Sequence, residues 1–164
     1  MLGESMENLN REYNKYENKP QNNFVKEEEI APYSTDSMKR LPVLGCIAAG
    51  QPIYRIEHLE GYTLVDPDTL KGKEGYALRV RGDSMIGDRI HDGDIVIVAE
   101  QEEVQPHEIA VVAVNGERAT LKRVERHGDM CLLVPSNPTM EPQLVPGRDV
   151  HILGKVVEVK FWVN

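Results

Sequence analysis

Short apolar segments separated by turn residues recur from residue 41 to the end of the chain. Residues 76–81 alternate apolar and polar side chains before Gly82, which indicates a strand that ends in a turn. The apolar run that follows Asp94 is continuous up to residue 99, as is typical of a strand buried on both faces. Four further segments of this kind lie at 109–114, 118–124, 131–134 and 151–163.

The connections between these segments indicate the fold class. Asn115 and Gly116 stand between two of them, and this pair is a strong signal for a two-residue hairpin. Short strands joined by Gly, Asp and Pro turns favour folded sheets over alternating βαβ units. We therefore expect a mostly β fold, with folded sheets of a ribbon-like or barrel-like kind.

The first 40 residues follow a different pattern. They carry six lysine or arginine residues against eight acidic ones, with many asparagines and few large apolar side chains. Such a segment buries too little apolar surface to form a core. We expect residues 1–40 to be a polar tail, partly helical or disordered up to about Lys19 and a linker after Pro20. Residues 41–164 are expected to form one domain.

Charge and cysteine content narrow the function classes. A net charge of −8 argues against nucleic-acid binding by this chain itself, because phosphate contacts rest on lysine and arginine surfaces. The two cysteines, Cys46 and Cys131, form no disulfide framework and no metal-ligand spacing, and the histidines show no ligand pattern. We expect a cytoplasmic protein without metal, cofactor or membrane span, since no apolar run approaches the roughly 20 residues that a span needs.

A candidate nucleophile follows the strand predicted at 76–81, in Gly82-Asp83-Ser84-Met85. A serine at such a strand end, near unpaired backbone N–H groups, has the exposed hydroxyl and the oxyanion donors that nucleophilic catalysis needs. The alternative is a helix N-cap, a position that serine and aspartate commonly occupy. Taken alone, the N-cap is the more frequent arrangement.

A candidate base lies in the strand predicted at 118–124. Strand alternation places Thr120, Lys122 and Val124 on one face, and one face of the strand must meet the core. A lysine with apolar neighbours loses hydration of its charged form, so its pKa falls and it can accept a proton near neutral pH. The alternative is a solvated lysine beside Arg123, which is the commoner case for a single strand lysine.

The segment Cys46-Ile47-Ala48-Ala49-Gly50-Gln51-Pro52 follows the polar tail directly. Small residues on both sides of a peptide bond let it enter a narrow active site, and glycine lets the backbone turn toward a nucleophile. The bond between Ala49 and Gly50 is a candidate cleavage site, although the segment alone also fits an ordinary turn. Cys46 has no histidine near it in sequence, and we expect it to be a packing residue.

These three segments occur in a specific order. Ser84 lies 35 residues beyond Ala49, Lys122 lies 38 residues beyond Ser84, and Ile90-His91-Asp92-Gly93-Asp94-Ile95-Val96 lies between them. In this order and spacing, residues 43–164 resemble the self-cleaving C-terminal domains of LexA-type repressors, lambda-type phage repressors and their relatives. Each motif is weak by itself, whereas the combination is specific.

The resemblance implies a LexA-like fold and a serine–lysine peptidase that cuts its own chain. It implies that Ser84 is the nucleophile, that Lys122 is the general base, and that the bond between Ala49 and Gly50 is the target. By position, the backbone N–H groups of Asp83 and Ser84 form the oxyanion hole. The bond must then leave an exposed resting position and dock beside Ser84.

The resemblance also implies partners. We expect a homodimer, an activated RecA filament that favours the docked state, and cleavage that relieves repression in a DNA-damage (SOS-type) response. Operator DNA is expected to be contacted only through an upstream helix-turn-helix domain, which residues 1–40 are too polar to form. Met1-Leu2-Gly3 resembles the Leu-Leu-Gly that often closes such a domain, so we expect a fragment that begins where that domain ends.

Three alternatives stay open. A natively short chain resembles the UmuD-like polymerase accessory proteins, although their self-cleavage removes an arm shorter than 49 residues. A signal peptidase shares the serine–lysine chemistry but needs a membrane anchor. In the third alternative Ser84 and Lys122 are idle and the domain only dimerises. Residues 155–163 then form either an edge strand that pairs across a two-fold axis or an ordinary internal strand.

Overall fold

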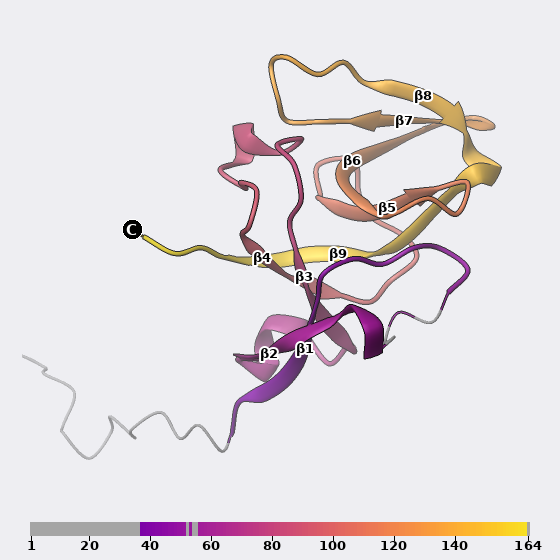
Figure 1. Cartoon of the computed structure of the whole chain (residues 1–164). Helices are drawn as coiled ribbons and strands as arrows, with labels where there is room; N and C mark the ends of the chain where they lie inside the picture. Colours follow the sequence, from indigo (N-terminus) through magenta and orange to yellow (C-terminus); the bar gives the residue numbers. More distant parts are fainter. Residues whose placement is uncertain (1–36, 52, 54–55, 164) are drawn as a thin grey trace, which may run out of the picture. The chain divides into compact units, whose positions relative to one another are not determined.

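The computed structural model describes residues 37–51, 53 and 56–163 (Figure 1). The polar tail expected at 1–40 lies almost entirely outside these residues and stays a prediction. In the described part, the first strand begins at Lys39, just before the domain start expected at residue 41.

The described residues form one mixed sheet of nine strands, in the order β2-β1-β3-β4-β9-β5-β6-β7-β8. All neighbouring strands are antiparallel except β1 and β3, which are parallel. The mostly β fold expected from the sequence is confirmed. The strands are β1 (Lys39–Leu44), β2 (Leu59–Val65), β3 (Gly75–Arg79), β4 (Ile95–Ala99), β5 (Ala110–Val114), β6 (Thr120–His127), β7 (Met130–Val134), β8 (Gln143–Pro146) and β9 (Val150–Lys160). Short 3₁₀ helices are η3 (Ile56–His58), η4 (Pro67–Leu70), η5 (Ile86–Asp88) and η6 (Gly147–Asp149).

Strands β3, β4, β5, β6, β7 and β9 lie where the apolar segments predicted them. The hairpin between β5 and β6 turns at Asn115 (φ 52°) and Gly116 (φ 75°), the pair of positive φ angles that a type I′ turn requires. Strands β1, β2 and β8 were not predicted. β2 and β8 are the edges of the sheet and expose many of their residues, so they lack the continuous apolar runs of buried strands.

Strand β9 joins the two halves of the sheet (Figure 1). Its first half pairs with β5 and its second half pairs with β4, with a register shift in each pairing. The segment 155–163 is therefore an internal strand up to Lys160, and the edge-strand alternative is wrong. Phe161, Trp162 and Val163 continue beyond the last paired residue and are exposed.

Buried apolar side chains form three clusters in the described part of the chain. The largest gathers residues from β1, β3, β4, β5 and β6 and includes Met85 and Leu121. Met85 follows Ser84 in sequence, and Leu121 precedes Lys122. Both candidate catalytic residues are thus anchored by a neighbour in the same core, which limits how far they can separate.

Candidate active site

Ser84 lies in the turn between β3 and η5. Gly82 begins this turn with φ 79°, a conformation that favours glycine, and its N–H donates to Asp92 Oδ1 at 2.7 Å. The N-cap residue of η5 is Met85, which makes no side-chain capping bond. The Ser84 hydroxyl instead donates to the carbonyl oxygen of Leu121 at 3.2 Å, so the N-cap alternative is wrong.

Lys122 is a buried residue of β6, with 6% of its surface exposed. Its ammonium donates to Thr120 Oγ1 at 3.0 Å and to the carbonyl oxygen of Leu121 at 3.1 Å. No carboxylate in the described part of the chain forms an ion pair with it. Burial away from water therefore lowers the pKa of Lys122 below its ordinary value of 10.5, as the sequence predicted.

Ser84 and Lys122 meet at one acceptor. Both side chains donate to the carbonyl oxygen of Leu121, so Ser84 Oγ and Lys122 Nζ are adjacent donors around a single atom. Residues 38 positions apart in sequence are thereby brought together by the contact between the β3–η5 turn and β6. A hydroxyl beside an amine of lowered pKa is the arrangement that general-base activation of a serine needs.

The backbone around Ser84 is held through its carbonyl groups. Asn137, a buried polar residue, donates from Nδ2 to the Asp83 carbonyl oxygen at 2.9 Å, and the Ser136 N–H donates to the Ser84 carbonyl oxygen at 2.8 Å. Among the described residues, no acceptor bonds the N–H groups of Asp83 and Ser84. These two N–H groups, expected to form the oxyanion hole, are thus free to bind a developing negative charge.

A two-point ion pair joins the turn of Ser84 to the strand of Lys122. Arg123 donates from Nη1 and Nη2 to the two carboxylate oxygens of Asp88, at 2.7 Å and 2.9 Å. The Arg123 guanidinium keeps the pKa of Asp88 below its ordinary value, and Asp88 raises the pKa of Arg123. This pairing constrains the approach of Ser84 to Lys122, because each partner is within four residues of one of them.

The candidate cleavage segment runs beside the start of β6. The Ala119 N–H donates to the Ile47 carbonyl oxygen at 2.8 Å, and Ala48 forms an isolated antiparallel bridge with Arg118. Gly50 is exposed and has φ 77°, in a turn that begins at Ala49. The segment before the bond is therefore pinned to the sheet, while the bond itself lies at an exposed turn.

A pocket of about 550 Å³ opens at Ser84. The cleavage segment contributes Gly45 and Cys46 to its wall, but Ala49 and Gly50 do not line it. The structure thus brings Ser84 and Lys122 together and leaves the expected target bond outside the pocket. The remaining lining residues are 57–60, 78–81 and 118–121.

Comparison with known proteins identifies the family. The family model described as Peptidase S24-like matches residues 42–157, which hold Ser84, Lys122 and the segment around Ala49. The chain belongs to the Peptidase S24-like family. The S24-like domain is also 42% identical over 127 residues to LexA repressor 1 of Geobacter sulfurreducens. The match covers 76% of this chain and 62% of that relative, so the chain spans less than two thirds of the relative's length.

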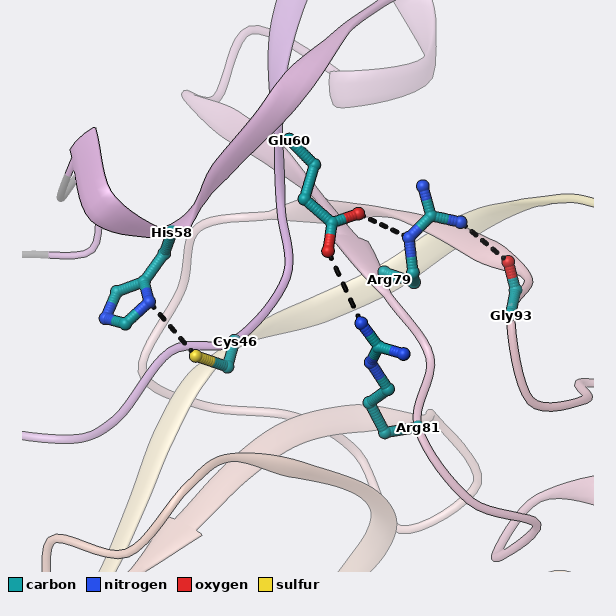
Figure 2. Close-up of polar contacts among 6 residues, drawn as sticks. All are labelled: Cys46, His58, Glu60, Arg79, Arg81 and Gly93. Carbon is teal, nitrogen blue, oxygen red and sulfur yellow. Dashed lines mark hydrogen bonds and ion pairs between the residues drawn. The ribbon is translucent and has the colours of Figure 1, made fainter.

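Charged side chains line one wall of the pocket in this S24-like domain (Figure 2). Glu60 on β2 pairs with Arg79 at the end of β3 and with Arg81, and Arg79 also donates from Nη1 to the Gly93 carbonyl oxygen at 3.1 Å. Glu60 thus connects β2 to the segment that leads to Ser84, and it balances part of the positive charge at the pocket.

Cys46 is not the simple packing residue expected from the sequence. Its Sγ lies 3.1 Å from Nδ1 of His58, as Figure 2 shows. The histidine is 12 positions away in sequence, so no local spacing could have revealed the contact. Cys131, in contrast, is buried in an apolar cluster with Leu133 and Ile152.

The described residues contain no group of three or more His, Cys, Asp or Glu side chains arranged to hold a metal ion. In the same residues, no helix has the length and apolar character needed to cross a membrane.

Several residues of the site were not found by sequence reasoning. Asp88, Arg123, Ser136 and Asn137 act through contacts between segments that are distant in sequence. A buried asparagine and an arginine in a strand carry no local signal that separates a positioning role from a solvated one. Among these four residues, only Arg123 could have been suspected of a role at the site, because it directly follows the candidate base Lys122.

Proposed function

We propose that this S24-like domain cuts its own bond between Ala49 and Gly50, with Ser84 as nucleophile and Lys122 as general base. One observation carries the proposal. The Ser84 hydroxyl and a buried lysine that pairs with no carboxylate among the described residues converge on the Leu121 carbonyl oxygen, beside an open pocket. A buried amine of lowered pKa is suited to accept a serine proton, whereas a structural lysine normally has a carboxylate partner.

The chemistry proceeds in two displacements. Neutral Lys122 takes the Ser84 proton while Oγ attacks the carbonyl carbon of Ala49. The oxyanion forms hydrogen bonds with the N–H groups of Asp83 and Ser84. The lysine then gives its proton to the nitrogen of Gly50 as the peptide bond breaks. Water, activated by the same amine, finally hydrolyses the ester between Ser84 and Ala49.

Regulation lies in the position of the bond. Ala49 and Gly50 do not line the pocket, so they must move into it before Ser84 can attack. The contacts of Ile47 and Ala48 with residues 118 and 119 favour the resting position. We propose that an activated RecA filament favours the docked position, and that cleavage relieves repression in an SOS-type response.

The partners follow from the same proposal. The likeness to a LexA repressor supports a repressor that contacts operator DNA through an upstream helix-turn-helix domain. Exposed Phe161 and Trp162, 65% and 81% accessible, support a homodimer formed next to the end of β9. An acidic chain of net charge −8 is not suited to bind DNA by itself.

The direct test is incubation of the purified chain between pH 7 and pH 10, with products identified by mass spectrometry. We expect fragments 1–49 and 50–164, and we expect both to be absent in Ser84→Ala and in Lys122→Ala. Circular dichroism of the two variants controls for folding. A wild-type chain that stays intact at pH 10 and with activated RecA filament contradicts the proposal and favours a domain that only dimerises.

A further inference from the structure

The thiol of Cys46 lies in a setting that the proposed cleavage chemistry does not use. Its Sγ is 3.1 Å from His58 Nδ1, and both residues line the pocket that contains Ser84. Nε2 of the same imidazole lies 3.6 Å from Glu57 Oε1. Thiol, imidazole and carboxylate thus form a chain of three groups (Figure 2 shows the thiol and the imidazole).

This arrangement favours a reactive thiol. An imidazole within hydrogen-bond distance of a thiol can take the thiol proton while the sulfur attacks an electrophile, as a general base does. The Glu57 carboxylate contacts the far side of the same ring. Cys46 is only half-buried and faces the pocket, so reagents in solution can reach it.

The pair also closes the base of the cleavage loop. The Gly45 N–H donates to the His58 carbonyl oxygen at 2.8 Å, next to the side-chain contact between Cys46 and His58. The bond between Ala49 and Gly50 lies within the loop that these contacts close. Chemical change at Cys46 therefore takes place three residues before Ala49 and in the wall of the pocket.

We propose that Cys46, paired with His58, is a modification site that reacts with hydroperoxides and then with small thiols. Cys46 Sγ attacks one peroxide oxygen while its proton passes to His58, so that an S–O bond forms and the O–O bond breaks. The leaving oxygen takes the proton held by His58 and departs as water or an alcohol. Sulfur is oxidised to a sulfenic acid and the peroxide is reduced. A small thiol then attacks the sulfenic sulfur, releases water and leaves a mixed disulfide.

One consequence rests on the proposed function. The group attached to Cys46 extends into the same pocket of about 550 Å³ that must receive Ala49 and Gly50. Because two occupants cannot share the space beside Ser84, the mixed disulfide slows self-cleavage. Reduction of the disulfide restores the pocket, so the control is reversible.

The site is tested on the full chain with limiting hydrogen peroxide followed by glutathione, and peptide mapping by mass spectrometry. A synthetic peptide of residues 43–49 supplies the reference rate of the same thiol without the fold. We expect Cys46 in the folded chain to react at least fivefold faster than the peptide, and buried Cys131 to stay unmodified. His58→Gln is expected to slow Cys46 by the same factor, at least fivefold, back to the peptide's rate. A folded chain that reacts no faster than the peptide overturns the site, and this comparison needs no variant.

The blocking effect is tested separately by self-cleavage at alkaline pH. We expect the glutathione adduct to cleave at least fivefold more slowly than the unmodified chain, and dithiothreitol to restore the rate. Treatment with peroxide and glutathione is expected to leave the cleavage rate of Cys46→Ser unchanged. An adduct that cleaves as fast as the unmodified chain overturns the blocking effect. If the unmodified chain never cleaves, the proposed function has failed, and the thiol rates still decide the modification site.

Discussion

Asp88 and Arg123 form a two-point ion pair that spans the candidate active site. Asp88 lies four residues after Ser84, and Arg123 directly follows Lys122. Arg123 also donates from Nε to the His107 carbonyl oxygen at 3.1 Å, so the guanidinium is fixed from a second side. Neither residue lines the pocket that contains Ser84. Their effect is on the separation between nucleophile and base.

Replacing Asp88 with asparagine is expected to weaken both fold and reaction. We expect Asp88→Asn to lower the free energy of unfolding at pH 7 by about 1–2 kcal/mol, and cleavage to slow about tenfold. Because pairing lowers the pKa of Asp88, this stabilisation is present above the ordinary value of 3.8 and is lost as the pH falls through the folded pKa. Urea unfolding of the wild type and of Asp88→Asn at several pH values measures this stabilisation. Glu125→Gln, at a partly exposed carboxylate on β6, is the matched control. An equal loss of stability and of cleavage rate in both variants contradicts the prediction.

The pH dependence of cleavage follows from the burial of Lys122. The base acts when neutral, so the rate rises with pH until the folded pKa is passed and then levels off. Because burial lowers that pKa, the plateau is expected to begin below pH 10.5, with a rise of about tenfold per pH unit beneath it. Initial rates between pH 6 and pH 11 measure the profile. Lys122→Arg, which stays charged, is expected to be inactive throughout. A rate that is independent of pH contradicts the role of Lys122.

The buried amine is also expected to reduce stability. Lys122→Met removes the cost of placing an amine in the core, while Ser84 still donates to the Leu121 carbonyl oxygen. We expect the free energy of unfolding at pH 7 to rise by about 1 kcal/mol and cleavage to be abolished. The gain shrinks as the pH rises from the folded pKa toward 10.5, since wild-type Lys122 then becomes neutral in both states.

Thermal and urea unfolding of Lys122→Met test this trade-off. Arg126→Met, at an exposed position of the same strand, is the control and is expected to change stability by only a few tenths of a kcal/mol. If Lys122→Met is less stable than wild type at pH 7, the amine contributes to the fold and the trade-off is wrong.

Asn137 is expected to act by positioning the oxyanion donors. Its Nδ2 bonds the Asp83 carbonyl oxygen, and its Oδ1 accepts from the N–H and the hydroxyl of Thr139. Asn137→Ala is expected to cost about 2 kcal/mol of stability and to slow cleavage by ten- to a hundredfold, with the midpoint of the pH profile unchanged. Thr139→Val removes one of the Thr139 bonds and is expected to cleave at nearly the wild-type rate. A shifted midpoint in Asn137→Ala contradicts a role confined to the backbone of Asp83.

Sequence reasoning found the buried strands and the ordered trio of motifs because both leave local or spaced patterns. The run at 95–99 is apolar throughout and is buried from Val96 onward, and Asn115-Gly116 determines a turn almost alone. Edge strands β2 and β8 were missed because solvent faces them, so their side chains carry no strong apolar signal. The contact of Cys46 with His58 joins residues 12 positions apart, which periodicity does not report.

The sequence likewise predicted part of the candidate dyad, Ser84 and Lys122, but not the contacts that support it. Spacing within a recognised order was enough to select Ser84 and Lys122, whereas strand alternation alone left open whether the lysine is buried or solvated. The shared acceptor at Leu121, the ion pair of Asp88 with Arg123 and the clamp of Asn137 on Asp83 arise only when separate strands pack together. Support of this kind is encoded in tertiary structure, and a single sequence does not reveal it.

The pinning of Ile47 and Ala48 against the start of β6 has a consequence for how long the protein lasts. In the proposed reaction, the observed rate is the rate of the chemical step multiplied by the fraction of chains with the bond docked. Each 1.4 kcal/mol added to or removed from the resting contacts changes that fraction about tenfold while docking is rare. The lifetime of the intact chain is thus determined by the docking equilibrium of the segment around Ala49 and Gly50. The catalytic residues can stay fully active while the bond is in its resting position.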